Sequence, residues 1–241
     1  MFYLIGLGMN LKSISVDALE ILKGCDEIYL ENYTVNFPYK ISELKKSLDV
    51  NIKELGRGGV EDESLLKDAK KKNVALLVYG DVLSATTHIQ LIISCKKQKI
   101  PYEIFHNASI LTVVAETGLS LYKFGKIASM PDWKEHTNKP MSFMNYVKEN
   151  LSIKAHTLLL TDIGLEIKDV IEQLEESMGE SLGLPEKIIV VSNAGTEKQK
   201  IFYGLFDKLK CKKIEVPFCV IIPSELHFLE KEVLEEVREK I

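Results

Sequence analysis

The amino-acid sequence predicts an α/β protein built from two domains. Short apolar runs that suit buried strands alternate with longer segments whose apolar residues recur at helical spacing, and this alternation is typical of α/β domains. The chain has 241 residues, of which 46% are hydrophobic and 27% are charged, so it is long enough for one large or two small domains. After about residue 108 the connections between the predicted strands and helices become longer. We therefore predict domains of residues 1–107 and 108–241.

The first domain is expected to form a parallel sheet, because helices separate its predicted strands. Continuous apolar runs predict strands at 2–8 and 74–81. The other expected elements are a helix at 15–23, a strand at 25–34, a helix at 42–48 with Ser42 as N-cap, a strand at 51–55, helices at 63–72 and 87–98, and a strand at 101–106. The Gly-rich segment 54–62 lacks the Gly-Lys-Ser/Thr ending of a phosphate loop, so we interpret it as a flexible loop.

The second domain is also predicted to be mixed α/β, with longer connections. Its expected elements are a strand at 123–131, a helix at 142–151, a strand at 156–163, a helix at 167–178, strands at 187–195 and 217–223, and a closing charged helix at 226–240. The segment from Lys200 to Lys210 fits either a helix or a strand, and its pattern leaves both open.

Charge and cysteine usage exclude several classes of protein. The chain has 31 Lys+Arg against 35 Asp+Glu, a net charge of −4, so we expect neither a nucleic-acid coat nor a polybasic membrane binder. No apolar run approaches the ~18 residues of a membrane span, and the opening segment lacks the basic start of a signal peptide. The four cysteines have neither disulfide nor zinc-ligand spacing. We therefore expect a cytoplasmic protein with reduced thiols and no metal.

A glycine pair follows the first predicted strand and invites a dinucleotide-binding interpretation. Gly6 and Gly8 stand between that strand and the next helix, but the fingerprint needs a third small residue where this chain has Leu11. The acidic residue that should end the second strand is only loosely matched by Glu31. The sequence therefore favours a strand-end turn with another use over a nicotinamide site.

The segment after the strand at 74–81 is well placed for ligand binding. Ligands of open α/β sheets gather beyond the carboxyl ends of the strands. Gly80 would allow close backbone approach, and Asp81 could accept a hydrogen bond from a ligand. The alternative is a purely structural turn in which a hydroxyl caps the next helix; the candidate caps are Ser84, Thr86 and Thr87.

Two histidines flank the same region, and neither identifies a reaction by itself. His88 and His106 are isolated in the sequence, and isolated histidines are more often structural than catalytic. The run 106–109, HNAS, could present polar groups to a cleft between the domains or serve as an ordinary connector. No Ser-His-Asp, Cys-His or paired-carboxylate pattern stands out, so no catalytic residue is assigned.

Several segments together resemble the diphthine synthase family, of the tetrapyrrole-methylase-like class. The segments are MFYLIGLGMN, ISVDALEILKGCDEIYLENYT, VALLVYGDVLSATTH, HNASI, TGLSLYKFGK, KENLSIKAHTLLLTDI, VVSNAGTE and PFCVIIPSELHFLEKEVLE. They occur in the family's order from one end of the chain to the other. The resemblance implies two α/β domains of the tetrapyrrole-methylase type with a cofactor cleft between them, and a homodimer.

The resemblance also implies an activity. Members of the family use S-adenosylmethionine, without a metal, to methylate a 3-amino-3-carboxypropyl-histidine on translation elongation factor 2. Successive transfers convert the amine to a trimethylammonium, and eukaryotic members also methylate the carboxylate. Alternatives are a tetrapyrrole methylase, a nicotinamide oxidoreductase, and a non-catalytic scaffold for the elongation factor.

Matching the family position by position gives eight candidate cofactor-binding residues. They are Met9, Asp81, Ser84, Ser109, Ile110, Thr161, Ala194 and Phe218. This chain departs from the family at four of the matched or adjacent positions: Met9 replaces a frequent Leu, Val82 a Pro, Thr161 an apolar residue and Phe218 a frequent His. The segment between residues 162 and 187 is also shorter than in many members.

A quaternary ammonium product suggests a further group of residues. Aromatic faces bind such cations, and four aromatic residues lie in predicted loops where they could line the substrate rim. They are Tyr33, Phe37, Tyr39 and Trp133.

Overall fold

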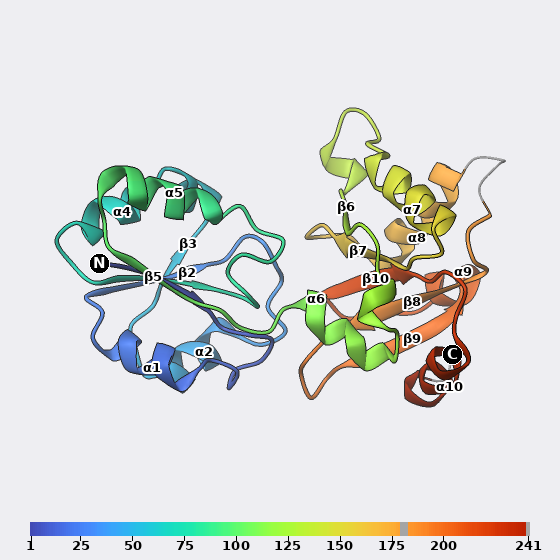
Figure 1. Ribbon diagram of the computed structural model, residues 1–241, viewed down its shortest axis with the longest axis horizontal. Coiled ribbons are helices and arrows are strands. Elements are labelled where there is room, and N and C mark those ends of the chain that lie inside the picture. The colour runs from blue at the N-terminus through green and yellow to red at the C-terminus, as the bar shows by residue number, and fades with distance from the viewer. Residues whose placement is uncertain (179–182, 240–241) are drawn as a thin grey trace. The chain divides into compact units, whose positions relative to one another are not determined.

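The computed structural model describes residues 1–178 and 183–239. The chain divides into two compact units, residues 1–113 and 114–241, which run from blue to green and from green to red in Figure 1. The boundary expected after residue 107 lies shortly before helix α6 (Ile110–Val113), with which the first unit ends. Each unit contains one five-stranded sheet, so the α/β fold class is confirmed.

The first unit has a parallel sheet with strand order β3-β2-β4-β1-β5, as the sequence predicts. Its strands are β1 (Phe2–Gly6), β2 (Glu27–Glu31), β3 (Lys53–Leu55), β4 (Val74–Val78) and β5 (Tyr102–Phe105). Besides α6, its helices are α1 (Val16–Lys23), α2 (Ile41–Leu48), α3 (Arg57–Glu61), α4 (Ser64–Ala69) and α5 (Ile89–Gln98).

Helices cover both faces of this sheet, and alternate residues of each central strand belong to different cores. Phe2 and Leu4 of β1 pack in the cluster that contains residues of α4 and α5, whereas Tyr3 and Ile5 pack with α1 and α2. Figure 1 shows these two helix pairs on opposite sides of the strands. A strand buried on both faces has no polar side, which explains the continuous apolar runs.

Two local predictions in this unit were wrong. Helix α2 begins at Ile41 with Lys40 as N-cap and without a side-chain cap, so Ser42 lies inside the first turn. The Gly-rich segment that was expected to be a loop contains helix α3, whose Val60 is 3% exposed. Packing of Val60 against the core offsets the poor helix propensity of the glycines.

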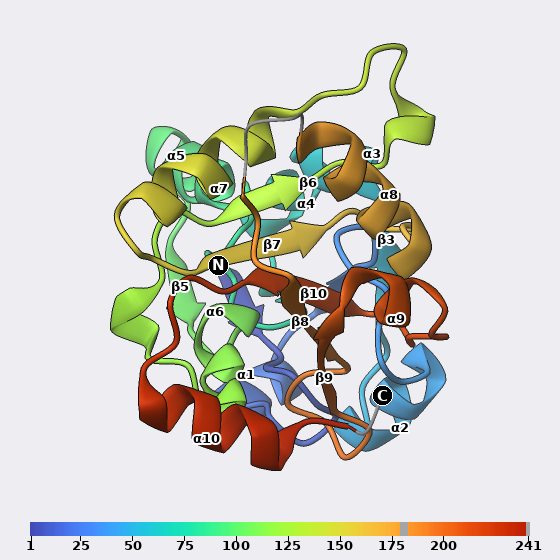
Figure 2. The same cartoon turned by 90° about the vertical axis from the view of Figure 1, so that its right-hand side faces the viewer.

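The second unit has a mixed sheet of order β6-β7-β10-β8-β9, seen from top to bottom in Figure 2. Strands β6 and β7 are parallel, and the other neighbours are antiparallel. The strands are β6 (Ala128–Met130), β7 (Thr157–Thr161), β8 (Lys187–Ser192), β9 (Lys200–Leu205) and β10 (Phe218–Ile222). The helices are α7 (Ser142–Ser152), α8 (Ile167–Met178), α9 (Phe206–Lys210) and α10 (Phe228–Val237), with 3₁₀ turns η1 (Val114–Thr117), η2 (Leu121–Lys123) and η3 (Trp133–Glu135).

The segment that fitted either a helix or a strand contains both. Its first half, β9, pairs with β8 over six positions from Lys200 to Leu205, and its second half is α9. Phe202 of β9 and Leu209 of α9 both pack into the main core of this unit, together with α7 and α8. Pairing with the preceding strand β8 therefore decides a pattern that the periodicity of the segment alone leaves ambiguous.

Several expectations concern features of the whole chain. Cys25, Cys95, Cys211 and Cys219 are not joined in disulfides. Within residues 1–178 and 183–239, no helix is long and apolar enough to cross a membrane, and no group of His, Cys, Asp or Glu side chains could hold a metal ion. The shortened segment expected between residues 162 and 187 includes 179–182, which lie outside the described residues.

Candidate functional site

The loops after three neighbouring strands carry the candidate residues of the first unit. Strands β4, β1 and β5 are adjacent and parallel, so their carboxyl ends share one edge of the sheet. Met9 follows β1, Asp81 and Ser84 follow β4, and Ser109 and Ile110 follow β5. The fold thus places all five candidates at the edge where open α/β sheets bind ligands.

Two glycines bring the first two loops into direct contact. Gly8 and Gly80 form an antiparallel bridge in which each amide donates to the other's carbonyl, at 3.1 and 3.0 Å. Both have positive φ, +70° and +73°, which L side chains rarely adopt. A Cβ on Gly80 would lie 3.8 Å from the sulfur of Met9 and 3.8 Å from the Cα of Ser109. Gly80 therefore lies in a small space bordered by candidates from two other loops.

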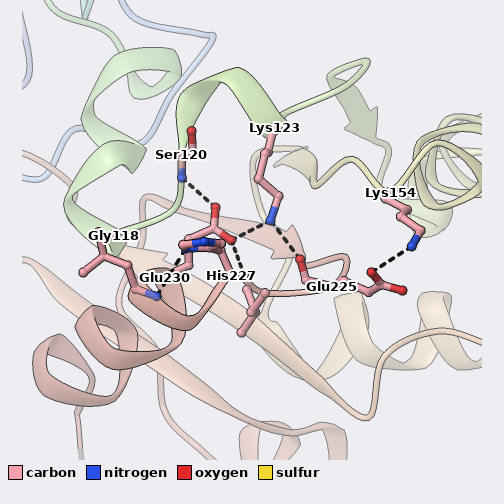
Figure 3. A pocket seen from close by; sticks show the side chains of 9 residues that line it. Gly118, Ser120, Lys123, Lys154, Glu225, His227 and Glu230 are labelled. Atoms are coloured by element: carbon pink, nitrogen blue, oxygen red, sulfur yellow. Dashed lines mark hydrogen bonds and ion pairs between the residues drawn. The ribbon is translucent and has the colours of Figure 1, made fainter.

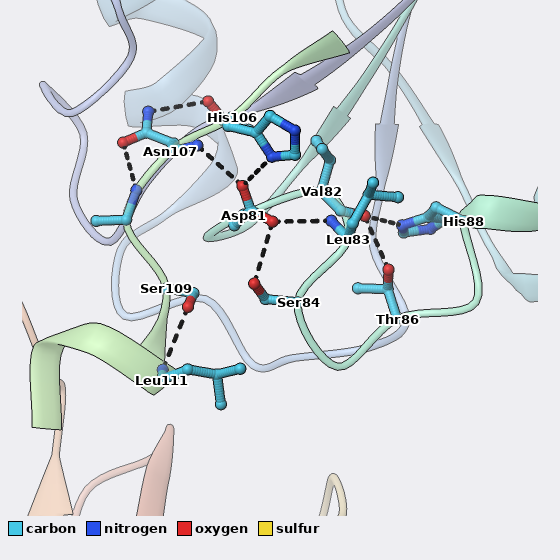
Figure 4. Close-up of polar contacts among 12 residues, drawn as sticks. Asp81, Val82, Leu83, Ser84, Thr86, His88, His106, Asn107, Ser109 and Leu111 are labelled. Atoms are coloured by element: carbon cyan, nitrogen blue, oxygen red, sulfur yellow. Dashed lines mark hydrogen bonds and ion pairs between the residues drawn. The ribbon is translucent and has the colours of Figure 1, made fainter. Parts of the chain in front are cut away.

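The Asp81 carboxylate joins the β4 loop to the β5 loop (Figure 4). Oδ1 accepts from the Leu83 amide at 3.0 Å and the Ser84 hydroxyl at 3.1 Å. Oδ2 accepts from the Asn107 amide at 3.1 Å and contacts His106 Nδ1 at 2.8 Å. Burial raises the pKa of Asp81, but these four partners outweigh burial and lower it below the ordinary value, so the carboxyl group is ionised at neutral pH.

Asn107 is a residue of this edge that the sequence did not single out. Its side-chain amide donates to the carbonyl oxygens of Gly6 at 3.0 Å and Ser13 at 2.8 Å, and its Oδ1 accepts from the Ala108 amide at 2.8 Å. One side chain thereby connects the end of β1, the loop before α1 and the β5 loop. The HNAS run contained this residue, but its partners are 101 and 94 positions away in sequence.

The two histidines of this region have different environments. The His106 side chain is 63% exposed and paired with Asp81. His88 is 2% exposed, its Nδ1 contacts the Val82 carbonyl at 3.2 Å, and its Nε2 lies 3.7 Å from Glu31 Oε2. His88 is therefore a structural side chain, whereas His106 presents its ring to solvent.

The alternative in which a hydroxyl caps α5 was wrong. His88 is the N-cap residue of that helix, and no side chain caps it. The Thr86 hydroxyl donates to the Val82 carbonyl at 2.8 Å, and the Ser84 hydroxyl to Asp81 at 3.1 Å. These hydroxyls stabilise the loop itself and do not start the helix.

The residues at this edge fit a nucleoside cofactor with a charged sulfonium chain. Met9 offers a buried apolar side chain, and its carbonyl is held by the Tyr79 hydroxyl at 3.1 Å. The Ser84 oxygen can still accept a hydrogen bond, and the Ser109 hydroxyl, which accepts from the Leu111 amide at 3.2 Å, can still donate one. Because Gly80 has no side chain, a ligand can approach its backbone closely.

The remaining candidates gather at one edge of the second unit's sheet. Thr161 ends β7, Phe218 begins the adjacent antiparallel β10, and Ala194 follows the next strand, β8. The Thr161 hydroxyl donates to the Phe218 carbonyl at 2.8 Å, and the Asn193 amide donates to the Pro217 carbonyl at 2.8 Å. The polar Thr161, where the family has an apolar residue, thus ties β7 to β10.

A separate pocket of about 740 Å³ lies in the second unit (Figure 3). Its polar side chains are paired with each other: Glu230 accepts from Lys123 at 2.6 Å and from the Ser120 amide at 3.0 Å, and Lys154 contacts Glu225 at 3.0 Å. None of the eight candidates lines it. This pocket is therefore distinct from both strand-end groups.

The four aromatic residues proposed for the substrate rim have other contacts. Phe37 and Tyr39 pack against the core and form ring contacts with each other and with Tyr79. Arg57 lies over the Tyr33 ring at 5.5 Å, and a lysine, Lys139, lies over the Trp133 ring at 5.0 Å. A role for these rings in binding an ammonium stays a prediction.

Comparison with known proteins identifies the family. The model for tetrapyrrole (corrin/porphyrin) methylases matches residues 1–210. A diphthine methyl ester synthase of Schizosaccharomyces pombe is 35% identical over 265 residues, covering 97% of this chain and 93% of that protein. A diphthine synthase of Methanococcus vannielii is 34% identical over 257 residues, covering 100% of both.

A solved structure agrees with these relatives. A crystal structure of diphthine synthase superposes with a TM-score of 0.87 at 32% identity, covering 98% of this chain and 95% of that chain. Sequence and fold therefore point to the same family over nearly the whole length. The chain belongs to the tetrapyrrole methylase family, among the relatives of diphthine synthase, and is an S-adenosylmethionine-dependent methyltransferase.

Proposed function

We propose that this enzyme methylates the 3-amino-3-carboxypropyl group of a modified histidine on translation elongation factor 2, in diphthamide biosynthesis. The observation that carries the proposal is the meeting of five family-matched residues at the ends of β4, β1 and β5. Full-length similarity to proteins named diphthine synthase and diphthine methyl ester synthase supports this substrate over a tetrapyrrole. We place the reaction in the cytoplasm and expect a homodimer.

Eight residues matched to the family are the proposed cofactor contacts. They are Met9, Asp81, Ser84, Ser109, Ile110, Thr161, Ala194 and Phe218. S-adenosylmethionine supplies an electrophilic methyl group on a sulfonium. Because both oxygens of Asp81 already accept two hydrogen bonds each, that side chain would serve chiefly to hold the loops. The hydroxyls of Ser84 and Ser109 keep an open hydrogen-bonding position for the cofactor.

Methyl transfer to an amine needs placement and a neutral nucleophile. Proximity and orientation can contribute about 7–11 kcal/mol to such a displacement. An α-amino group with a pKa of about 8 is mostly protonated at pH 7, so roughly a tenth is neutral. Desolvation in the site would favour the neutral amine. We propose three successive transfers to the amine, and transfer to the carboxylate as a fourth if the enzyme follows the S. pombe relative.

Calorimetry with four small ligands and with the elongation factor tests the class of enzyme. We expect the full chain to bind S-adenosylmethionine and S-adenosylhomocysteine, and to bind neither NAD nor a tetrapyrrole. Binding of NAD alone would contradict the proposal in favour of an oxidoreductase. Binding of a tetrapyrrole together with the sulfonium cofactor would favour a macrocycle methylase, and binding of the elongation factor with no cofactor at all would favour a scaffold.

A further inference from the structure

We infer that His106 is the base that removes the proton from the acceptor amine, and that Asp81 orients and polarises its ring. This inference rests on the proposed function, because it names the acceptor as an amine. Three observations carry it: the 2.8 Å contact between His106 Nδ1 and Asp81 Oδ2, the exposure of the His106 side chain, and its position at the strand-end edge that carries the cofactor candidates.

The contact with Asp81 determines which nitrogen of His106 is free. An ionised carboxylate can only accept hydrogen bonds, so Nδ1 must carry the proton that it shares with Oδ2. The neutral ring then has its lone pair on Nε2. No hydrogen bond in the described part of the chain involves that nitrogen, and the side chain is 63% exposed. His106 is therefore held in the tautomer that accepts a proton from outside the protein.

The Asp81 carboxylate is itself held from two loops. The Leu83 amide and the Ser84 hydroxyl fix Oδ1, and the Asn107 amide fixes Oδ2 beside the histidine. A carboxylate that orients a histidine while the other ring nitrogen exchanges protons is the arrangement that activates nucleophiles in many enzymes. Asp81 is the charged group that the structure shows facing His106.

Each reaction cycle moves one proton from the substrate to His106 and one methyl group to the amine. The Nε2 lone pair takes one proton from the substrate ammonium, which becomes a neutral amine while His106 becomes an imidazolium paired with Asp81. The amine nitrogen then bonds to the methyl carbon, and the carbon–sulfur bond breaks with its electron pair on sulfur. The imidazolium returns its proton to water, which reaches the exposed ring, and the cycle repeats for each further methyl group.

Other titratable groups at this edge are less suited to the role. His88 and Glu31 are buried, with side chains 2% and 1% exposed, and face each other at 3.7 Å. Asp81 has four donors on its two oxygens, so it has no free acceptor position. In the described loops that follow β4 and β5, His106 is the exposed histidine, and its Nε2 lone pair is open to an outside proton donor.

The first test reads the tautomer without any turnover. In protein labelled with ¹⁵N-histidine, we expect the His106 nitrogen shifts of the neutral ring to show a proton on Nδ1, and Asp81→Asn to alter that pattern. A neutral ring with its proton on Nε2 would overturn the inference, because the nitrogen that faces solvent could then accept no proton.

The second test is the rate of methyl transfer. We expect His106→Gln to slow the first transfer to the amine by about 100-fold or more at pH 7, with the dissociation constant of S-adenosylmethionine unchanged within twofold. The deficit should shrink as pH rises past the amine pKa of about 8, because the substrate then arrives neutral. A purely structural role would give a deficit that does not depend on pH.

A matched histidine variant and the wild-type enzyme distinguish a failure of this inference from a failure of the proposed function. His136 is exposed in the second unit, outside both strand-end groups, and His136→Gln should retain the wild-type rate. An active wild-type enzyme with a His106→Gln rate within threefold of it overturns this inference alone. A wild-type enzyme that binds the cofactor and methylates no modified elongation factor refutes the proposed function instead.

Discussion

The side-chain amide of Asn107 donates a hydrogen bond to the carbonyl oxygen of Gly6 at 3.0 Å, across 101 residues of sequence. The same amide donates to Ser13 at 2.8 Å, and the Asn107 backbone donates to Asp81 at 3.1 Å. The end of β1, the β4 loop and the β5 loop therefore hold one another in place. The geometry of the proposed cofactor edge depends on these long-range contacts more than on any one loop.

Replacing Asn107 should loosen this edge. Asn107→Ala leaves the Gly6 and Ser13 carbonyls without their donor, which should lower the free energy of unfolding by about 1–3 kcal/mol and weaken S-adenosylmethionine binding. Urea denaturation and calorimetry measure both. The control is Asn32→Ala, since the Asn32 side chain donates to Glu54 on the surface; a loss as small as in that control would show that Asn107 does not organise the site.

Replacing Gly80 tests the space at the cofactor edge. Gly80→Ala places a methyl group 3.8 Å from Met9 Sδ and keeps a positive φ that costs roughly 1–2 kcal/mol. Cofactor affinity should fall together with stability. Gly58→Ala, where nothing lies within 4 Å of the new Cβ, should leave affinity unchanged and stability equal or higher. Equal affinities for the two variants would contradict the assignment of this space.

Asp81 should be required for cofactor binding even though its oxygens are occupied by protein donors. Asp81→Ala removes the acceptor shared by Leu83, Ser84 and Asn107, and we expect the dissociation constant of S-adenosylmethionine to rise at least tenfold, about 1.4 kcal/mol. Asp62, which accepts from the Ser64 amide on the surface, supplies the control Asp62→Ala. An unchanged dissociation constant for Asp81→Ala would rule out this role.

Acid stability should depend on Glu230 in the second unit. Burial raises the pKa of this carboxyl, but Lys123, the His227 and Ser120 amides and His156 outweigh burial and lower it to about 2. Its folded pKa lies below the unfolded value near 4.5, so its contribution, about 3 kcal/mol, is present above pH 4.5 and is lost as pH falls toward 2.

Denaturation at two pH values measures this contribution. Glu230→Gln should lower the free energy of unfolding by a few kcal/mol at pH 7 and by much less near pH 2.5. Glu225→Gln, whose partner Lys154 is also exposed, should cost less than about 1 kcal/mol at either pH. A Glu230→Gln deficit that stays constant between the two pH values would contradict the assigned pKa.

His156 should contribute to acid sensitivity at higher pH. Its Nδ1 accepts from the Ser224 amide at 2.9 Å, and burial lowers its pKa below the ordinary 6.5, although Glu230 opposes that effect. The unfolded chain therefore binds the proton more readily, and stability falls as pH drops below 6.5. His156→Gln should flatten the wild-type decline between pH 6.5 and 5 in a thermal-denaturation series.

The sequence predicted elements whose pattern is dictated locally. Helix α8 has the bounds expected from its apolar spacing, 167–178, and β1 and β4 are the two continuous apolar runs. The wrong prediction at α3 and the open one at β9 both depend on tertiary context: α3 forms over glycines because Val60 is buried, and β9 forms because β8 lies beside it. Helix propensity and hydrophobic periodicity describe only the local segment, so they do not indicate which residues elsewhere in the chain pack against it.

The sequence identified residues of the candidate site, but it did not predict the contacts that these residues make with one another. The resemblance named Asp81, and the strand-end position supported it, yet neither indicated that its carboxylate joins two loops through His106 and Asn107. Those residues were visible as a polar HNAS run with two open interpretations. Their role follows from contacts 25 and 26 residues apart, which only the folded chain reveals.

The most direct test of the proposed function is the mass of the modified peptide after reaction. Purified enzyme is incubated with S-adenosylmethionine and with elongation factor 2 that carries the unmethylated 3-amino-3-carboxypropyl-histidine. The account predicts a gain of three methyl groups on the amine, and a fourth that mild base removes if the carboxylate is also esterified. An unchanged peptide mass, with S-adenosylmethionine bound to the enzyme, would contradict the proposed acceptor.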